Sequence, residues 1–298
     1  MLRGFDEYGI GNTPIVELPR VNGNRIIIKL EMQNFLKSIK ARTAYWIIKN
    51  LSADAKDKII VESSSGNMGY ALGYFCRESG RKFVCLIDDS ISACKRERLK
   101  ESGIEYICVK KEKGCDLRGS RIRQAERMMA GGQYYWVNQY DNPFGIMAHE
   151  MTTGMEIWKQ TEGNVTHCVC AMGSGGTIIG VGRCLKNLSK KVKIVGVEPF
   201  GSTIYGTVDA PYINAGTGLR GKPGNILRNS EIVDDSYTVT DKESIGFAKE
   251  LRDRFGLNAG LSSGMAYAGA LKIAARETGA VILMVAPDGG ESYAEYLR

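Results

Sequence analysis

The sequence predicts an α/β fold in which mainly parallel sheets are flanked by helices. Short runs rich in β-branched residues alternate with segments of helical periodicity along the whole chain. Two of these runs, residues 192–197 and 280–285, are apolar almost throughout, as strands covered on both faces should be. The length of 298 residues suits two domains or one large α/β unit. Ligands of such folds bind at the carboxyl ends of the strands, so the loops that follow the strands are the first candidates for a site.

Each element follows from local composition. Strands are expected where the residues are mainly β-branched or apolar, at positions 25–30, 58–61, 83–87, 106–109, 165–171, 192–197 and 280–285. Helices are expected where apolar residues recur at helical spacing, at positions 40–50, 67–78, 93–102, 120–130, 150–160, 177–188, 242–255 and 263–277. The glycine-rich segment 198–232 fits neither pattern and is too long for an ordinary connection, so we expect it to lie over a site.

Composition and charge exclude several classes of protein. Apolar residues make up 43% and charged residues 24%, which excludes a disordered or fibrous chain. No apolar run approaches the ~20 residues of a transmembrane helix, and the first residues lack the apolar core of a secretion signal. The net charge is +7, but no nucleic-acid-binding module accompanies the basic run at 95–100, which we expect to be a solvated helix face. We therefore expect a cytoplasmic protein with reduced cysteines, no nucleic-acid partner and no membrane contact.

The sequence Met172-Gly-Ser-Gly-Gly-Thr177 lies between an apolar strand and a helix. Its glycines let backbone N–H groups converge on an anion, the helix N-terminus adds a partial positive charge, and Ser174 and Thr177 add hydroxyl groups. A dinucleotide fingerprint fails because its third glycine is missing, and a Walker A loop fails because no lysine follows Gly176. A tight turn without a ligand is the alternative, but a single phosphate group explains the glycines and hydroxyls better.

A second polar turn, Glu62-Ser-Ser-Ser-Gly-Asn-Met-Gly69, also lies between a strand and a helix. Its hydroxyl and N–H groups could bind a carboxylate, or they could only cap the following helix. Together the two turns suggest one ligand with two anionic ends. Lys40 begins a helix; a lone lysine is normally solvated, but one near a phosphate site could form a Schiff base with a carbonyl cofactor. The only histidines, His149 and His167, are too few for a multi-histidine metal site, and no metal is expected.

An ordered set of short motifs runs over almost the whole chain. They are I-G-N-T-P (10–14), K-L-E (29–31), N-x-x-x-S-x-K-x-R (34–42), S-S-G-N-x-G (64–69), Asn138-Gln139 with Asn142-Pro143 and His149, T-G-M-E-I-W (153–158), G-S-G-G-T (173–177), V-E-P (197–199), S-S-G (262–264) and P-D-G-G-E-S-Y (287–293). This set resembles the pyridoxal-phosphate enzymes of the cysteine synthase and cystathionine β-synthase family. The resemblance implies the tryptophan-synthase-β-like fold, fold type II, with pyridoxal 5'-phosphate held between two domains. It implies a homodimer, a large domain of residues 1–43 and 144–298, and a small mobile domain of residues 44–143 that closes over the substrate.

The resemblance also implies roles for individual residues. It implies that Lys40 is the Schiff-base lysine, that Asn67 contacts the pyridine 3'-oxygen and that Asp288 is the partner of the pyridine nitrogen. The residues implied for the cofactor phosphate are Gly173, Ser174, Gly175, Gly176 and Thr177. Those implied for the carboxylate of the amino-acid substrate are Ser64, Ser65, Asn67 and Gln139.

Several positions depart from the usual cysteine synthase motifs. Ala41 replaces an aspartate, Met68 replaces the last threonine of T-S-G-N-T, and Asp288 stands where many members have serine. These departures resemble the branch of the family that joins O-phosphoserine to glutamate on the way to 2,3-diaminopropionate. The reaction implied is β-replacement, in which O-phosphoserine or O-acetylserine loses its β-substituent through an aminoacrylate and an amino-acid nucleophile such as glutamate adds.

Other reactions of the family remain open. Sulfide as the nucleophile would make the protein a cysteine synthase, and cysteine as the substrate would make it a sulfide-releasing enzyme. A non-catalytic regulatory relative is the third alternative, although the intact Lys40 argues against it. Glutamate needs a cationic partner for its side-chain carboxylate, whereas sulfide does not. Arg220, between flexible glycines, is the first choice for this cation, and Lys222 lies beside it.

Overall fold

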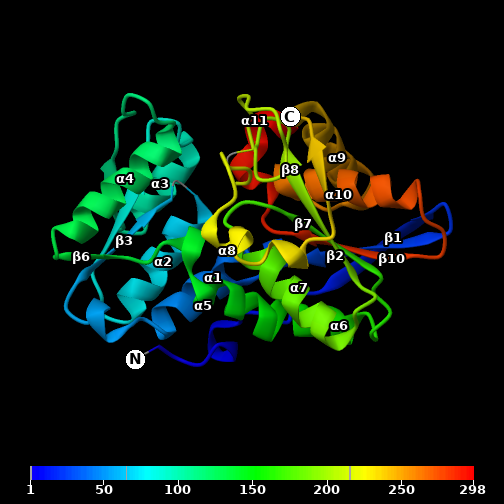
Figure 1. Cartoon of the computed structure of the whole chain (residues 1–298), viewed down its shortest axis with the longest axis horizontal. Helices are drawn as coiled ribbons and strands as arrows, with labels where there is room; N and C mark the ends of the chain where they lie inside the picture. The colour runs from blue at the N-terminus through cyan, green and yellow to red at the C-terminus, as the bar shows by residue number, and fades with distance from the viewer. Residues whose placement is uncertain (1, 65, 215) are drawn as a thin grey trace.

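The computed structural model describes residues 2–64, 66–214 and 216–298. Within these residues the chain forms two sheets that lie side by side, each flanked by helices (Figure 1). The larger sheet has the strand order β1 (Ile15–Val21), β2 (Asn24–Leu30), β10 (Val281–Ala286), β7 (His167–Ala171), β8 (Lys193–Pro199) and β9 (Asp235–Val239). The smaller sheet has the order β5 (Glu105–Cys108), β4 (Phe83–Ile87), β3 (Ile59–Ser63) and β6 (Tyr134–Trp136). All described neighbours pair in parallel except β1 and β2, which confirms the predicted α/β class.

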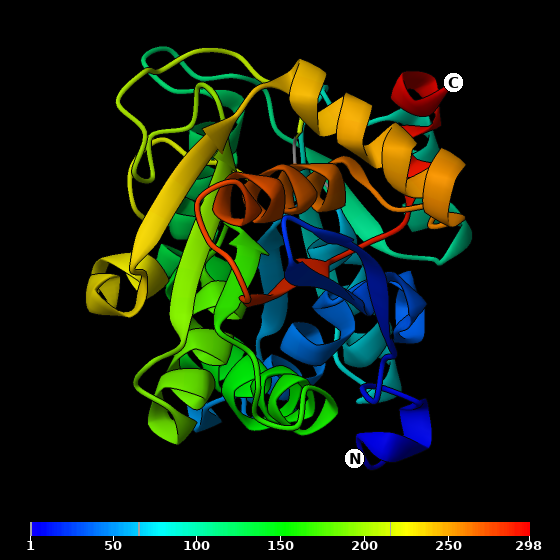
Figure 2. The ribbon, with the colours of Figure 1, turned by 90° about the vertical axis from the view of Figure 1, so that its right-hand side faces the viewer.

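Helices cover both faces of the larger sheet because its strands are apolar on both sides. On β10, Ile282 and Met284 belong to the cluster that contains α10 (Leu261–Ala274), and α9 (Asp241–Phe255) lies beside α10 (Figure 2). Leu283 and Val285 belong to the opposite cluster, which contains residues of α7 (Gly176–Leu188). Alternate side chains of one strand therefore enter two different helix layers, which explains the unbroken apolar run in the sequence.

The smaller sheet is covered in the same way. Ile60 and Cys85 pack in one cluster with α1 (Lys40–Lys49) and α2 (Asn67–Glu78). Val61 and Leu86 pack on the other face, in the cluster that contains residues of α4 (Leu117–Ala130). The described strands of this sheet lie between residues 59 and 136, and those of the larger sheet lie outside this range. The limits 43/44 and 143/144 for the two domains remain a prediction.

The strands that the sequence patterns missed are all at sheet edges. β1, β6 and β9 each have only one neighbour among the described strands, and β1 also contains Pro19. Edge strands need no continuous apolar pattern, because one side can meet solvent. The expected helix at 150–160 is instead a continuous path of α5 (Pro143–Ala148), the π-helical turn η6 (His149–Thr153) and α6 (Gly154–Gln160). Among the described residues, no helix combines the length and apolar character needed to cross a membrane.

The long segment between β8 and β9 lies over the site, as its length and composition predicted. Apart from the short helices α8 (Gly224–Leu227) and η7 (Ser230–Ile232), its described residues follow an irregular path. Its residues 216–219 line a cavity between the two sheets. α3 (Ala93–Glu101) and α11 (Ala294–Leu297) complete the α-helices of the described chain.

Candidate active site

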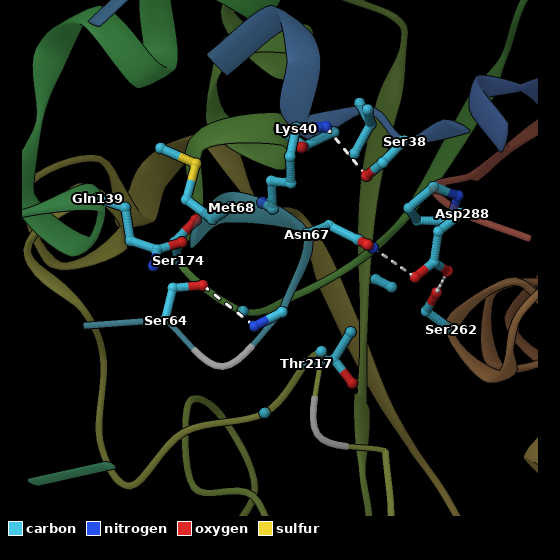
Figure 3. Close-up of a pocket in the computed structure, with 18 of the residues that line it drawn as sticks. Ser38, Lys40, Ser64, Asn67, Met68, Gln139, Ser174, Thr217, Ser262 and Asp288 are labelled. Atoms are coloured by element: carbon cyan, nitrogen blue, oxygen red, sulfur yellow. Dashed lines mark hydrogen bonds between the residues drawn. The ribbon is translucent and has the colours of Figure 1, made fainter. Parts of the chain in front are cut away.

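This cavity lies where the loops after β3, β7 and β10 meet (Figure 3). These loops follow the carboxyl ends of parallel strands, which is where ligands of α/β folds bind. Residues far apart in the sequence thus come together. The residues predicted from the sequence that line the cavity are Lys40, Ser64, Asn67, Gln139, Gly173, Ser174, Gly175, Thr177 and Asp288.

Lys40 is the first residue of α1 and faces this cavity. Its backbone N–H donates to the hydroxyl of the buried Ser38 at 3.2 Å, and the N–H of Ile39 donates to the carbonyl of Pro287 at 2.9 Å. These bonds fix the start of α1 against the loop that carries Asp288. Burial lowers the pKa of the Lys40 ammonium, while the Asp288 carboxyl acts in the opposite direction. A lysine with a lowered pKa supplies the neutral amine that attacks carbonyl groups.

The loop at 173–177 has the geometry of an anion cradle. Gly175 has a φ of 87°, and a Cβ there would lie 2.6 Å from the Cγ1 of Ile226. A Cβ on Gly176 would lie 3.1 Å from the carbonyl oxygen of Gly145, so this glycine packs tightly at the start of α7. Gly175 therefore requires glycine, and Gly176 leaves little room for a side chain. The N-terminus of α7 and the cavity-lining Ser174 and Thr177 offer N–H and hydroxyl donors to one anion.

His149 supports the cradle from behind. Its Nε2 lies 3.0 Å from the hydroxyl oxygen of Thr43 and 3.4 Å from that of Thr177, and its Nδ1 lies 3.0 Å from that of Thr153. Burial, followed by the charges of Lys40 and Arg42, holds the pKa of His149 well below its usual range. A neutral, fully surrounded imidazole orients the Thr177 hydroxyl and does not line the cavity. These contacts indicate a structural rather than a basic role for this histidine.

The second polar turn both caps a helix and faces the cavity. The Ser64 hydroxyl accepts from the N–H of Gly69 at 3.0 Å and from that of Gly66 at 3.4 Å, which satisfies donors at the start of α2. Gln139 lies on the adjoining η5 (Gln139–Asp141), and its side-chain amide donates to the carbonyl of Ser63 at 3.3 Å. Ser65 lies outside the described residues. Capping of the following helix and binding of a carboxylate, the two alternatives for this turn, are therefore compatible.

Asp288 gathers several polar groups at the end of β10. Its carboxylate accepts from the Asn67 amide at 2.8 Å and from the Ser262 hydroxyl at 3.3 Å (Figure 3). It also accepts from the Tyr293 hydroxyl at 3.4 Å. Burial raises the pKa of Asp288, and Lys95 followed by these hydrogen bonds opposes the rise. The Asn67 bond joins the two sheets across the cavity, because α2 packs on the smaller sheet and Asp288 follows the larger one. A buried acid at this place can serve a basic ring nitrogen.

Three of the family motifs, which have no assigned role so far, meet in a buried ion network at the first turn of α1. Arg42, fully buried in the first turn of α1, pairs with Glu31 at 2.7 Å and with Glu156 at 2.6 Å. Lys29 pairs with Glu156 at 2.7 Å, and the Thr13 hydroxyl donates to Glu31 at 2.6 Å. Removing one partner of such a network leaves a buried charge unpaired, so these side chains hold α1, and with it Lys40, in place.

The structure does not bring Arg220 to the cavity. Its side chain is 60% exposed, and its Nε lies 3.0 Å from a carboxylate oxygen of Asp209. Lys222 is exposed and lies over the ring of Tyr205. The flexible glycines around Arg220 leave it on the outer surface of the segment, where an aspartate neutralises it. Neither residue is therefore placed to meet a substrate in this cavity.

Three other cationic side chains line the cavity, and all come from residues 44–143. They are Lys95 on α3 and Arg118 and Arg121 on α4. Arg121 is 5% exposed, its Nε lies 2.8 Å from Asp88, and its Nη1 is buried without a hydrogen-bond partner. The Arg118 guanidinium donates to the carbonyl of Gly218 on the opposite side of the site. The expectation that the basic run at 95–100 forms a solvated helix face was therefore wrong for Lys95. Arg118 and Arg121 are three residues apart and so lie on one face of α4, and this spacing could have indicated from the sequence that they act together.

These features define a class of site. A half-buried lysine of lowered pKa, an anion cradle at a helix N-terminus and a buried acid line one cavity. No cluster of three or more metal-ligating side chains occurs in the part of the chain that the structure describes. The lysine and the cradle fit pyridoxal 5'-phosphate, which carries one aldehyde and one phosphate, because Gly175 and Gly176 keep the cradle free of side chains.

Comparisons with known proteins agree with this class. The sequence matches the family described as "Pyridoxal-phosphate dependent enzyme" over residues 7–288. It is 36% identical over 295 residues to cysteine synthase B of Salmonella typhimurium, covering 96% of this chain and 93% of that protein. The fold is similar to a cysteine synthase structure from Entamoeba histolytica, with a TM-score of 0.89, 31% identity and coverage of 99% of this chain and 89% of the other. A hydrogen sulfide-producing enzyme from Fusobacterium nucleatum gives a TM-score of 0.86, 28% identity and coverage of 96% of both chains.

The chain belongs to the pyridoxal-phosphate-dependent cysteine synthase family, with the fold of type II. It is accordingly a β-replacing enzyme whose cofactor is pyridoxal 5'-phosphate. Its substrates are small molecules.

Proposed function

We propose that the enzyme carries out β-replacement on O-phosphoserine, with an acidic amino acid such as glutamate as the nucleophile. The observation that supports this proposal is the set of basic side chains Lys95, Arg118 and Arg121 in the cavity wall. Arg121 carries the most weight, because its buried Nη1 has no hydrogen-bond partner among the described residues. A desolvated guanidinium favours an anion and can hold a phosphate or a carboxylate with two parallel hydrogen bonds.

The side chains at the site divide the chemistry between them. We expect Lys40 to hold the cofactor, to take the α-proton of the substrate and to return a proton at the end, because burial makes its amine available in the neutral form. The cofactor supplies an electron sink when bound. We expect Ser64 and Gln139 to bind the substrate carboxylate, and Asn67 and Asp288 to contact the cofactor ring.

We also propose that residues 44–143, which form the smaller sheet and its helices, close over the substrate. The three cations all come from residues 44–143, whereas the cradle and Asp288 come from residues 144–298. An anionic substrate between them is attracted to both sides, so its binding would draw the two parts together and exclude water. Closure would thus be coupled to the presence of a charged substrate.

A cysteine synthase reaction is the alternative, and it rests on the names of the relatives. Sulfide needs neither a large cavity nor a cationic partner, so the basic side chains favour an anionic donor or nucleophile over sulfide alone. A sulfide-releasing reaction on cysteine is the second alternative. Neither O-acetylserine with sulfide nor cysteine brings an anion beyond the α-carboxylate that we assign to Ser64 and Gln139, so neither gives the buried Nη1 of Arg121 a ligand.

The direct test is product analysis by mass spectrometry. The holoenzyme is offered O-phosphoserine or O-acetylserine, each with glutamate, sulfide or cysteine. The expected product is the carbon–nitrogen adduct of glutamate, formed faster from O-phosphoserine than from O-acetylserine. Formation of cysteine as the main product, with no glutamate adduct from either serine derivative, would contradict the proposal.

We also infer that the enzyme is a homodimer. Met147, Met151 and Met155 follow one another at intervals of four along α5, η6 and α6, and they are 41%, 59% and 48% exposed. A row of exposed apolar side chains is a frequent mark of a protein–protein contact, and methionine adapts well to such surfaces. A second copy of this chain is the partner that the family resemblance implies.

A further inference from the structure

Glu62 is a buried carboxylate without a role in the proposed chemistry. It lies near the end of β3, directly before the turn that carries Ser64, and its side chain is inaccessible to solvent. It accepts from the backbone N–H of Ser63 at 2.8 Å and from that of Gln139 at 3.0 Å. Longer contacts of 3.5 Å come from the indole N–H of Trp136 and from the side-chain amide of Gln139. One carboxylate therefore joins the turn after β3 to the start of η5.

The groups around Glu62 leave its charge without a counter-ion. Its donors are all uncharged, and it forms no ion pair with any residue that the structure describes. Cys85 on β4 and Tyr140 on η5 are the titratable groups that interact with it electrostatically. Arg121 on α4 acts on both of those groups, and its own guanidinium is paired with Asp88. Burial raises the pKa of Glu62 to about 7, with the hydrogen bonds from Gln139, Trp136 and Ser63 opposing the rise.

We propose that Glu62 is a positioning residue that holds Gln139 and the turn at Ser64 in the geometry that binds the carboxylate of the amino-acid substrate. This inference rests on the proposed role of Ser64 and Gln139. As a carboxylate, Glu62 accepts from the backbone N–H groups of Ser63 and Gln139 at once. The turn at Ser64 and the start of η5 therefore keep a fixed distance from each other. When one oxygen of Glu62 carries a proton, that oxygen becomes a donor and faces another N–H donor. One of the two hydrogen bonds is then lost, and either the turn at Ser64 or the start of η5 is no longer held in place. Affinity for the substrate carboxylate should therefore depend on the ionisation of a side chain that never touches the substrate.

The test compares the holoenzyme with the isosteric variant Glu62→Gln. Binding of L-serine, which carries the α-amino and α-carboxylate groups but lacks a good leaving group, is followed through the visible absorption of the cofactor between pH 6 and 8.5. The parent should bind more weakly as the pH falls through about 7, whereas the variant should bind about tenfold more weakly than the parent at pH 8, as expected for loss of one hydrogen bond to a charged group. The variant should also lack the step near neutral pH. The matched control Glu105→Gln, at an exposed position of β5, should keep the parent's affinity and its step.

A second readout does not depend on the substrate. Because the folded-state pKa of Glu62 is raised above the ordinary carboxyl value, the stability that its protonation contributes is complete below about pH 4.5 and is lost as the pH rises through about 7. The unfolding temperature of the parent should therefore fall over this window relative to that of Glu62→Gln. A stability step that is the same in both proteins would overturn the assignment of the titrating group. Equal serine affinity in the two proteins at pH 8 would overturn the positioning role, whereas failure of glutamate to react would overturn only the proposed nucleophile.

Discussion

The substitution Arg121→Lys separates the two tasks of this side chain. Arg121 is paired with Asp88, whose side chain is 2% exposed, so removal of the charge would leave a buried carboxylate unpaired. Such a loss typically costs about 3–5 kcal/mol of folding stability and would obscure any effect on binding. Lysine keeps the charge beside Asp88 but lacks the second nitrogen that we assign to the substrate anion. Loss of a hydrogen bond to a charged group costs about 1.5–3 kcal/mol, which corresponds to binding that is about ten- to a hundredfold weaker.

The assay measures kcat/KM for O-phosphoserine and for O-acetylserine at one fixed concentration of the nucleophile. We expect the value for O-phosphoserine to fall by about ten- to a hundredfold and the value for O-acetylserine to change little, because the acetyl group is uncharged. Arg220→Ala is the matched control, since Arg220 is an exposed arginine outside the cavity, and it should leave both values unchanged. Equal losses for both serine derivatives in Arg121→Lys would show that this side chain does not bind the phosphate of O-phosphoserine.

Three further predictions concern the cradle, its support and the surface. Gly176→Asp should lower cofactor content after dialysis more than it lowers the unfolding temperature. Its Cβ would lie 3.1 Å from the Gly145 oxygen, and its carboxylate would repel the phosphate of the cofactor. Unchanged cofactor content would show that the loop is only a turn. The pKa of His149 in the folded state lies below its unfolded value of about 6.5, so the stability that its neutral form contributes is present above that pH and is lost as the pH falls below it. His149→Gln should remove this part of the pH dependence of the unfolding temperature. An unchanged profile would show that another group titrates. Met151→Lys should shift the mass in light scattering from dimer to monomer, whereas a parent that is already monomeric would contradict the inferred interface.

Local sequence signals predicted the parts of the fold that depend on local physics. The glycines at 173–177 and the polar turn that includes Gly66 and Gly69 follow strands and begin helices, and such turns can be recognised without knowledge of the rest of the chain. Apolar runs likewise predicted the central strands, because both of their faces are buried. The edge strands β1, β6 and β9 were missed because only part of their surface is buried and their residues are mixed in character.

The positions of charged side chains could not be predicted in the same way. Arg220 and Arg121 are both arginines in segments without a family motif, yet one pairs with Asp209 at the surface and the other lies buried beside Asp88. Which of them faces the cavity depends on how α4 packs against the smaller sheet, and this packing involves contacts distant in sequence. Glu62 was overlooked for a similar reason, since its partner Gln139 is 77 residues away along the chain.

Lys40 is the residue on which the chemistry depends, and its attachment to the cofactor can be measured directly. The holoenzyme is reduced with borohydride, which fixes the cofactor to its lysine, and the digested protein is analysed by peptide mass spectrometry. The pyridoxyl group is expected on the peptide that contains Lys40, and the variant Lys40→Ala should carry none and show no turnover. Lys95 also lines the cavity and provides an internal alternative. A pyridoxyl group found on Lys95, or on any lysine other than Lys40, would contradict the assignment of the active site.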